Sequence, residues 1–129
     1  MVDPVVPVSW GELLDKIAIL EIKRLRLRAP QAVANAEREL AALTPALAVL
    51  DPTPAELEDL RTALARVNRR LWEIEDQIRE KDAQADFGAE FVALARSVYH
   101  ENDERGRIKR AINTLLQSTL VEEKQYSAY

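Results

Sequence analysis

Apolar residues recur at alternating intervals of three and four along two long stretches of this chain. In residues 53–81 they form a seam of more than three heptads: Leu57, Leu60, Leu64, Val67, Leu71, Ile74 and Ile78. In residues 87–117 the same spacing gives Phe91, Leu94, Val98, Glu101, Arg105, Ile108, Ile112 and Leu115. This period matches the α-helix and not the alternation of a strand, so both stretches are predicted to be long helices.

Prolines and capping residues divide the beginning of the chain. Residues 2–8 hold two prolines among β-branched residues, which favours an extended arm. Ser9 and Glu12 have the spacing of a capping box, so a helix is predicted over residues 10–28. Pro30 suits the first turn of the helix that follows.

A second short helix is predicted over residues 31–50, with Pro45 kinking or restarting its last turn. Thr53 and Glu56 have capping-box spacing at the start of the first long helix. Residues 118–129 are less regular, and one option for them is to pair as a strand with the N-terminal arm.

These elements predict an all-α protein, a four-helix bundle built on a long antiparallel helical hairpin. One domain is expected over residues 1–129, in four parts: an extended arm at 1–8, a short helix pair at 9–50, the hairpin at 53–117 and a C-terminal tail at 118–129. The loop of the hairpin is short, which makes its helices antiparallel. Because the short helices cannot cover the long ones, we expect self-association as a homodimer.

Composition narrows the function classes. The formal net charge of −4 argues against bulk nucleic-acid binding, which favours basic proteins. With no cysteine and one histidine, the chain lacks the usual metal-ligand and nucleophile patterns, so no catalytic residue, metal or cofactor is predicted. It has no run of about 20 uncharged apolar residues and no secretory leader pattern, so no membrane partner is predicted and the cytoplasm is the expected location.

The second long stretch carries polar residues inside its own apolar seam. Glu101 and Arg105 stand where aliphatic side chains belong, and Asn102, Lys109 and Asn113 fall on the same face. Buried charge is costly unless it is paired. Each of these side chains is therefore expected to have a partner or a ligand.

The residues predicted to share this polar layer come from three helices. In a hairpin that turns near residue 84, Asn68 comes level with Glu101 and Asn102. Two more residues of the 53–81 stretch and two of the 10–28 stretch point toward the same region. The candidate ligand-binding set is Glu21, Arg24, Asn68, Glu75, Arg79, Glu101, Asn102, Arg105 and Lys109.

Three functions are compatible with this layer. A buried ion-pair network that fixes helix register is the favoured interpretation, and it predicts a non-catalytic interaction or scaffold module of unknown pathway. The alternative is a small anionic ligand-binding protein or a cofactor-free enzyme, with Arg24, Arg105 and Lys109 as charge partners. A second alternative is an RNA- or phosphate-facing regulatory protein. Gly106, inside the same helix, indicates close helix packing, a kink or room for a ligand.

Several short motifs are similar to those of a known family. They are VPVSWGEL at residues 6–13, LWEIED at residues 71–76 and LARSVY at residues 94–99. Together they resemble an uncharacterised family of small bacterial proteins, a domain of unknown function. The resemblance spans nearly the whole chain and implies a bacterial protein of one domain, but it implies no activity.

Overall fold

The computed structural model describes residues 1–128, which contain four α-helices, one 3-10 helix and no strand. Helix α1 covers Trp10–Arg26, α2 covers Pro30–Leu43, α3 covers Ala55–Ala83 and α4 covers Ala89–Leu115. The 3-10 helix η1, Thr44–Val49, follows α2 directly. The predicted all-α class with four main helices is confirmed.

The helix starts follow the sequence signals only in part. The Ser9 hydroxyl accepts a hydrogen bond from the Glu12 amide at 3.1 Å, so the first predicted cap is present. The second capping box is wrong, because the Thr53 hydroxyl donates to the Leu50 carbonyl at 2.6 Å and α3 begins without a side-chain cap. Pro45 ends the α-helical part of its segment, and the chain continues as η1.

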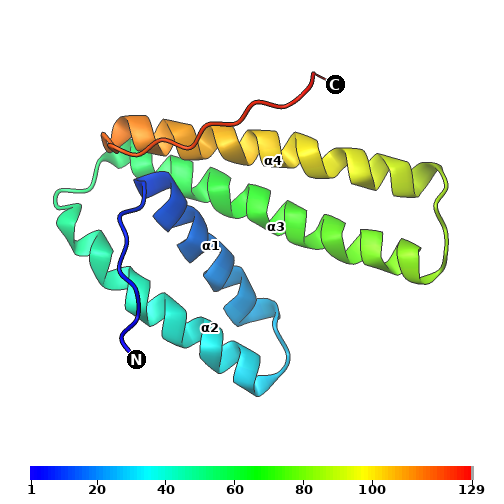
Figure 1. The fold of residues 1–129 in the computed structure, drawn as a ribbon, viewed down its shortest axis with the longest axis horizontal. Coiled ribbons are helices and arrows are strands. Elements are labelled where there is room, and N and C mark those ends of the chain that lie inside the picture. Colours follow the sequence, from blue (N-terminus) through cyan, green and yellow to red (C-terminus); the bar gives the residue numbers. More distant parts are fainter. Residues whose placement is uncertain (129) are drawn as a thin grey trace.

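Figure 1 shows α3 and α4 side by side, with the chain reversing at residues 84–88, and α1 and α2 as a second pair near one end of them. Helix α1 contacts α2, α3 and α4. Because it is surrounded in this way, its buried residues are not confined to one face: Gly11, Leu14, Asp15, Ile17, Ala18, Leu20 and Ile22.

The core lies where α1 meets the first half of α3 and the second half of α4. Its buried apolar residues are Leu14, Ile17, Ala18, Leu57, Leu64, Val67, Ile108 and Ile112. By contrast, every residue from 69 to 107 is exposed or only partly buried. The ends of α3 and α4 nearest their turn extend beyond α1 and α2 in Figure 1, and we call residues 71–98 the distal segment.

The tail, residues 116–128, contains no helix or strand and runs back along α4 (Figure 1). The optional strand pairing with the N-terminal arm is not formed by the described residues. The tail predicted from the sequence extends to residue 129, which lies outside the described part of the chain.

Candidate functional site

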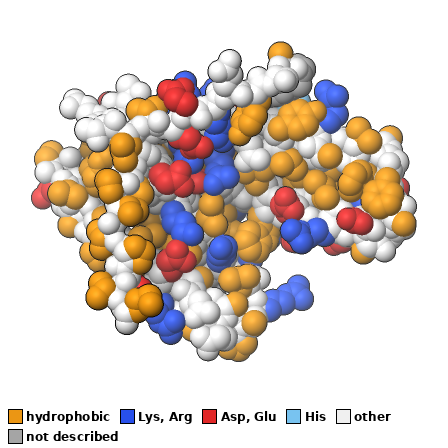
Figure 2. Space-filling model, viewed as in Figure 1, with side chains coloured by type: hydrophobic (Ala, Val, Ile, Leu, Met, Phe, Trp, Pro, Cys, Tyr) orange, Lys and Arg blue, Asp and Glu red, His pale blue; other side chains and the backbone are white. Residues whose placement is uncertain are grey.

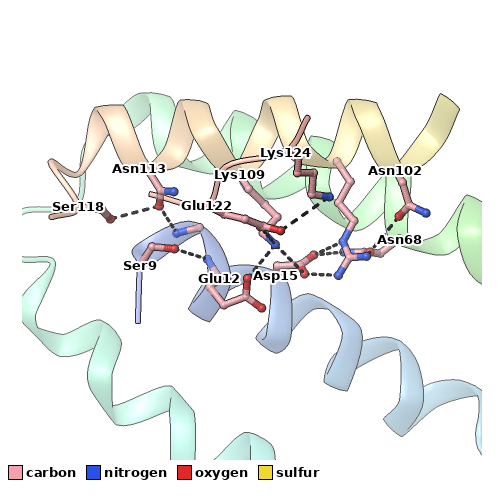
Figure 3. Close-up of polar contacts among 12 residues, drawn as sticks. Ser9, Glu12, Asp15, Asn68, Asn102, Lys109, Asn113, Ser118, Glu122 and Lys124 are labelled. Atoms are coloured by element: carbon pink, nitrogen blue, oxygen red, sulfur yellow. Dashed lines mark hydrogen bonds and ion pairs between the residues drawn. The ribbon is translucent and has the colours of Figure 1, made fainter. Parts of the chain in front are cut away.

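Two matching rows of residues bring α1 and α4 together. Gly11 and Asp15 are one helical turn apart on α1, and Arg105, Lys109 and Asn113 follow at the same spacing of four on α4. Figure 3 shows Asp15, Lys109 and Asn113 between the two helices, with Asn68 reaching in from α3 and Glu122 from the tail. Residues four apart lie on one face of a helix, so each row presents its polar groups to the other.

Asp15 is the centre of this contact. It is only 1% exposed, and its carboxylate accepts hydrogen bonds from Asn68 Nδ2 at 2.9 Å and from Arg105 Nε at 2.9 Å. Arg105 Nη2 also donates to the second carboxylate oxygen, so the guanidinium binds Asp15 through two nitrogens. The hydrogen bond to Asp15 raises the pKa of Arg105. A buried carboxylate is tolerated here because a cation and an amide both bind it.

Lys109 lies beside Asp15 and joins it to the tail. Its ammonium group donates to Glu12 at 2.8 Å and to Glu122 at 3.0 Å, and lies 3.8 Å from Asp15. Burial has the largest single effect and would lower the pKa of Lys109, but the hydrogen bonds to Glu12 and Glu122, together with the charges of Asp15 and Glu12, raise the pKa overall. We call Glu12, Asp15, Asn68, Arg105 and Lys109 the polar cluster.

The N-terminus of α1 is closed by α4 and the tail. Asn113 Oδ1 accepts hydrogen bonds from the Gly11 amide at 2.7 Å and from the Ser118 hydroxyl at 3.2 Å. Ser118 Oγ in turn accepts from the Trp10 amide at 2.9 Å. The first amides of a helix have no partner within it. These contacts, with the Ser9 cap, satisfy the first three amides of α1.

Gly11 allows the two helices to approach this closely. A Cβ atom at Gly11 would lie 2.5 Å from the Lys109 carbonyl oxygen and 2.9 Å from Asn113 Oδ1. At Gly106 a Cβ atom would meet only the Lys124 side chain, at 3.9 Å. Of the three explanations offered for Gly106, close helix packing is therefore excluded, and the close approach occurs at Gly11.

Four of the nine predicted site residues meet as expected. Asn68, Arg105 and Lys109 belong to the polar cluster, and Asn102 accepts from Arg105 Nη1 at 3.4 Å. Arg105 and Glu101 have separate partners, however, because Glu101 pairs with Arg70 at 3.6 Å. One oxygen of Glu101, Oε2, is buried without a hydrogen-bond partner.

The other four predicted residues lie apart from the cluster. Glu75 and Arg79 form an exposed pair on α3 at 3.4 Å. Arg24 is exposed near the end of α1. Glu21 is half-buried and lines a different cavity, together with Glu58 and Arg61 of α3.

Asp15 and Glu12 are the partners that sequence reasoning missed. The sequence prediction for residues 10–28 assumes a single inward face, and a face centred on Ile17 places Asp15 on the opposite side of the helix. That inference fails because α1 is buried on more than one face. The available signal is a second row of residues, Gly11, Asp15 and Ile22, which has helical spacing and lies off the main stripe.

A groove beside the polar cluster holds five of the predicted residues. Its volume is about 440 Å³, and it lies between α1, α3 and α4. Apolar walls come from Ile19, Leu71, Trp72 and Val98, and the polar residues that line it are Asn68, Glu75, Asp76, Arg79, Asn102 and Arg105. Both arginines are engaged, Arg79 with Glu75 and Arg105 with Asp15.

The described residues contain no group of three or more His, Cys, Asp or Glu side chains placed to hold a metal ion. Within the same residues, no helix has both the length and the apolar character needed to cross a membrane. The charged groups of the polar cluster are paired with one another. This arrangement is typical of a structural ion-pair network.

The chain matches the DUF6165 family, a family of unknown function, over residues 5–129, and it belongs to that family. No curated protein and no solved structure gives a significant match. The similarity to a domain family without an assigned function, which the motifs indicate, is thereby confirmed.

Proposed function

We propose that this member of the DUF6165 family is a non-catalytic interaction module that self-associates through α3 and the distal segment. Its architecture in this proposal is a four-helix bundle whose long antiparallel hairpin, α3 and α4, extends beyond the short helix pair. The observation that carries the proposal is the lack of any buried residue from 69 to 107. The bacterial cytoplasm, which the resemblance and the composition indicate, is the proposed setting.

The distal segment has the apolar seams of a packed helix pair, but the rest of the described chain does not fully cover them. Its seam residues Leu71, Ile74, Ile78, Phe91, Leu94 and Val98 are all partly exposed. Phe87 and Val92 are more than half exposed, at 56% and 52%. Figure 2 shows hydrophobic side chains gathered over this end of the molecule. Helices in water depend on packing of their apolar face, so this segment gains from being covered.

A separate, charged face of α3, opposite the seam that contains Leu71, favours a second copy as a partner. Exposed arginines precede residue 71 and exposed acidic residues follow it: Arg66, Arg69 and Arg70, then Glu73, Glu75 and Asp76. Arg66 and Asp76 are each five residues from residue 71, and Arg69 and Glu73 are each two residues from it. Two antiparallel α3 helices centred there would place Arg66 opposite Asp76 and Arg69 opposite Glu73 of the other copy, which is the self-complementarity a two-fold interface requires.

A charge exchange on α3 tests this dimer. Arg66→Asp alone and Asp76→Arg alone each create two like-charge contacts across the two-fold interface. Each is expected to raise the dimer dissociation constant about tenfold, or roughly 1.4 kcal/mol, in sedimentation equilibrium. The double variant Arg66→Asp/Asp76→Arg restores opposite charges and should return to near the wild-type value.

Arg28→Asp is the matched control, because Arg28 is exposed, lies beyond the end of α1 and is not part of α3. It should leave the dissociation constant unchanged. A monomeric wild-type protein, or a double variant as weak as the single ones, would rule out this dimer.

The groove beside the polar cluster supports a second candidate, a small-molecule binding protein. Its volume of about 440 Å³ falls within the usual range of ligand pockets, and it gathers five residues that the sequence marks as ligand-binding. Native mass spectrometry of protein purified from its source should then show a bound small anion. That added mass should disappear in Trp72→Ala, which removes an apolar wall of the groove.

A further inference from the structure

We propose that α4 carries a docking track for an extended acidic peptide of a partner protein, and that the chain's own tail occupies this track. The track consists of Gly106, Lys109, Arg110 and Asn113. The tail has no helix or strand of its own, and yet it follows α4 (Figure 1). The tail is therefore a peptide segment of this chain that already binds the surface we assign to a partner peptide.

Three successive contacts hold the tail on the track. The Ser118 hydroxyl donates to Asn113 Oδ1 at 3.2 Å. The Glu122 carboxylate accepts from Lys109 at 3.0 Å, and Glu123 lies 3.8 Å from Arg110. The track therefore recognises a hydroxyl residue followed four and five positions later by two carboxylates.

The polar cluster does not need Glu122 for charge balance. Lys109 and Arg105 are matched by the carboxylates of Glu12 and Asp15, and all four belong to the helices. Glu122 adds a third carboxylate, and its side chain is 46% exposed. The two cations of the helices keep their two helical carboxylates without Glu122, so the tail can leave while the cluster stays paired.

The space between the tail and α4 suits an acidic strand. A cavity of about 240 Å³ lies there, and its charged lining residues are Asp103, Arg107, Lys109, Arg110, Glu122 and Lys124. Of those on α4, three are cations and one, Asp103, is a carboxylate, whereas Glu122 and Lys124 belong to the tail. Gly106 also lines the cavity, and only the Lys124 side chain comes near it, at 3.9 Å from a Cβ placed there.

Lys109 also favours a charged carboxylate at this position. The hydrogen bond from Lys109 lowers the pKa of Glu122 below the ordinary value of 4.5. A carboxyl group whose pKa is lowered on binding stabilises the bound state at pH values above the pKa of the free group. The contribution is lost as the pH falls through the lowered value.

A displaced-tail variant tests the proposal. The probe is a fluorescent peptide with the sequence of residues 118–128, STLVEEKQYSA. The receptor is the full chain with Glu122→Gln and Glu123→Gln, which weakens its own tail on the track. Fluorescence anisotropy should show this variant binding the peptide at least tenfold more tightly than wild type, because the tethered wild-type tail competes at a high effective concentration.

Matched controls separate the track from general charge attraction. Arg110→Gln in the displaced-tail variant should weaken peptide binding, whereas Arg96→Gln, the same change at an exposed α4 position away from the track, should not. A peptide with glutamine at both glutamate positions should bind at least tenfold more weakly. Lowering the pH from about 7 to about 4 should weaken binding of the original peptide as its glutamates take up protons.

Equal binding by wild type and the displaced-tail variant would overturn the proposal. So would equal binding of the glutamate and glutamine peptides, or no peptide binding to the displaced-tail variant. Circular dichroism of each variant confirms that the helices are intact, since all the substituted side chains are at least partly exposed.

Discussion

Replacing Arg105 with methionine should lower the free energy of unfolding by about 3 kcal/mol. The reason is that Asp15, at 1% exposure, would lose the guanidinium that binds both of its oxygens. Removing one partner of a buried ion pair leaves an uncompensated charge. Lys109, 3.8 Å from Asp15, limits the loss but already serves Glu12 and Glu122. Urea unfolding followed by circular dichroism measures the change.

A second substitution shows that the stranded charge causes the loss. Asp15→Asn in the Arg105→Met background removes the charge and keeps an acceptor for Asn68. The double variant should recover at least half of the lost stability. Arg70→Met, which removes the half-exposed partner of Glu101, should cost less than about 1 kcal/mol. If the double variant were less stable than Arg105→Met alone, the pairing of Asp15 with Arg105 would not explain the loss.

The fold could be anticipated where the sequence carries periodic or capping signals. The apolar seam from Leu57 to Ile78 predicts α3, and Ser9 predicts the start of α1. Thr53 has the same capping pattern, but its hydroxyl turns to the Leu50 carbonyl instead. A capping motif gives the helix boundary, and the preceding loop decides which hydrogen bond its side chain makes.

The candidate site was less predictable, because periodicity gives one face of a helix at a time. The seam of α4 correctly marks Arg105 and Lys109 as inward residues. Their main partner, Asp15, lies on a second buried face of α1, which exists only because three helices surround α1. The tail contributes Glu122 from an irregular segment that has no periodicity to read.

Substituting alanine for Gly11 is the second change with a large expected effect. In most helices this change stabilises by up to about 1 kcal/mol. Here the new Cβ would lie 2.5 Å from the backbone oxygen of Lys109, and helix α4 would have to move. That movement would disturb the hydrogen bond from the Gly11 amide to Asn113 and the contact of Asp15 with Lys109. We expect a loss of about 2–3 kcal/mol in the free energy of unfolding.

Gly106→Ala is the matched control, since both glycines lie within helices. A Cβ at Gly106 meets only the flexible Lys124 side chain at 3.9 Å, so alanine should stabilise the protein by up to about 1 kcal/mol. The two substitutions therefore differ in sign, although the chemical change is identical. Denaturant unfolding of both variants would show the difference directly. A similar gain at both positions would mean that α1 does not approach α4 closely at Gly11, and the polar cluster would then lack the contact that brings its residues together.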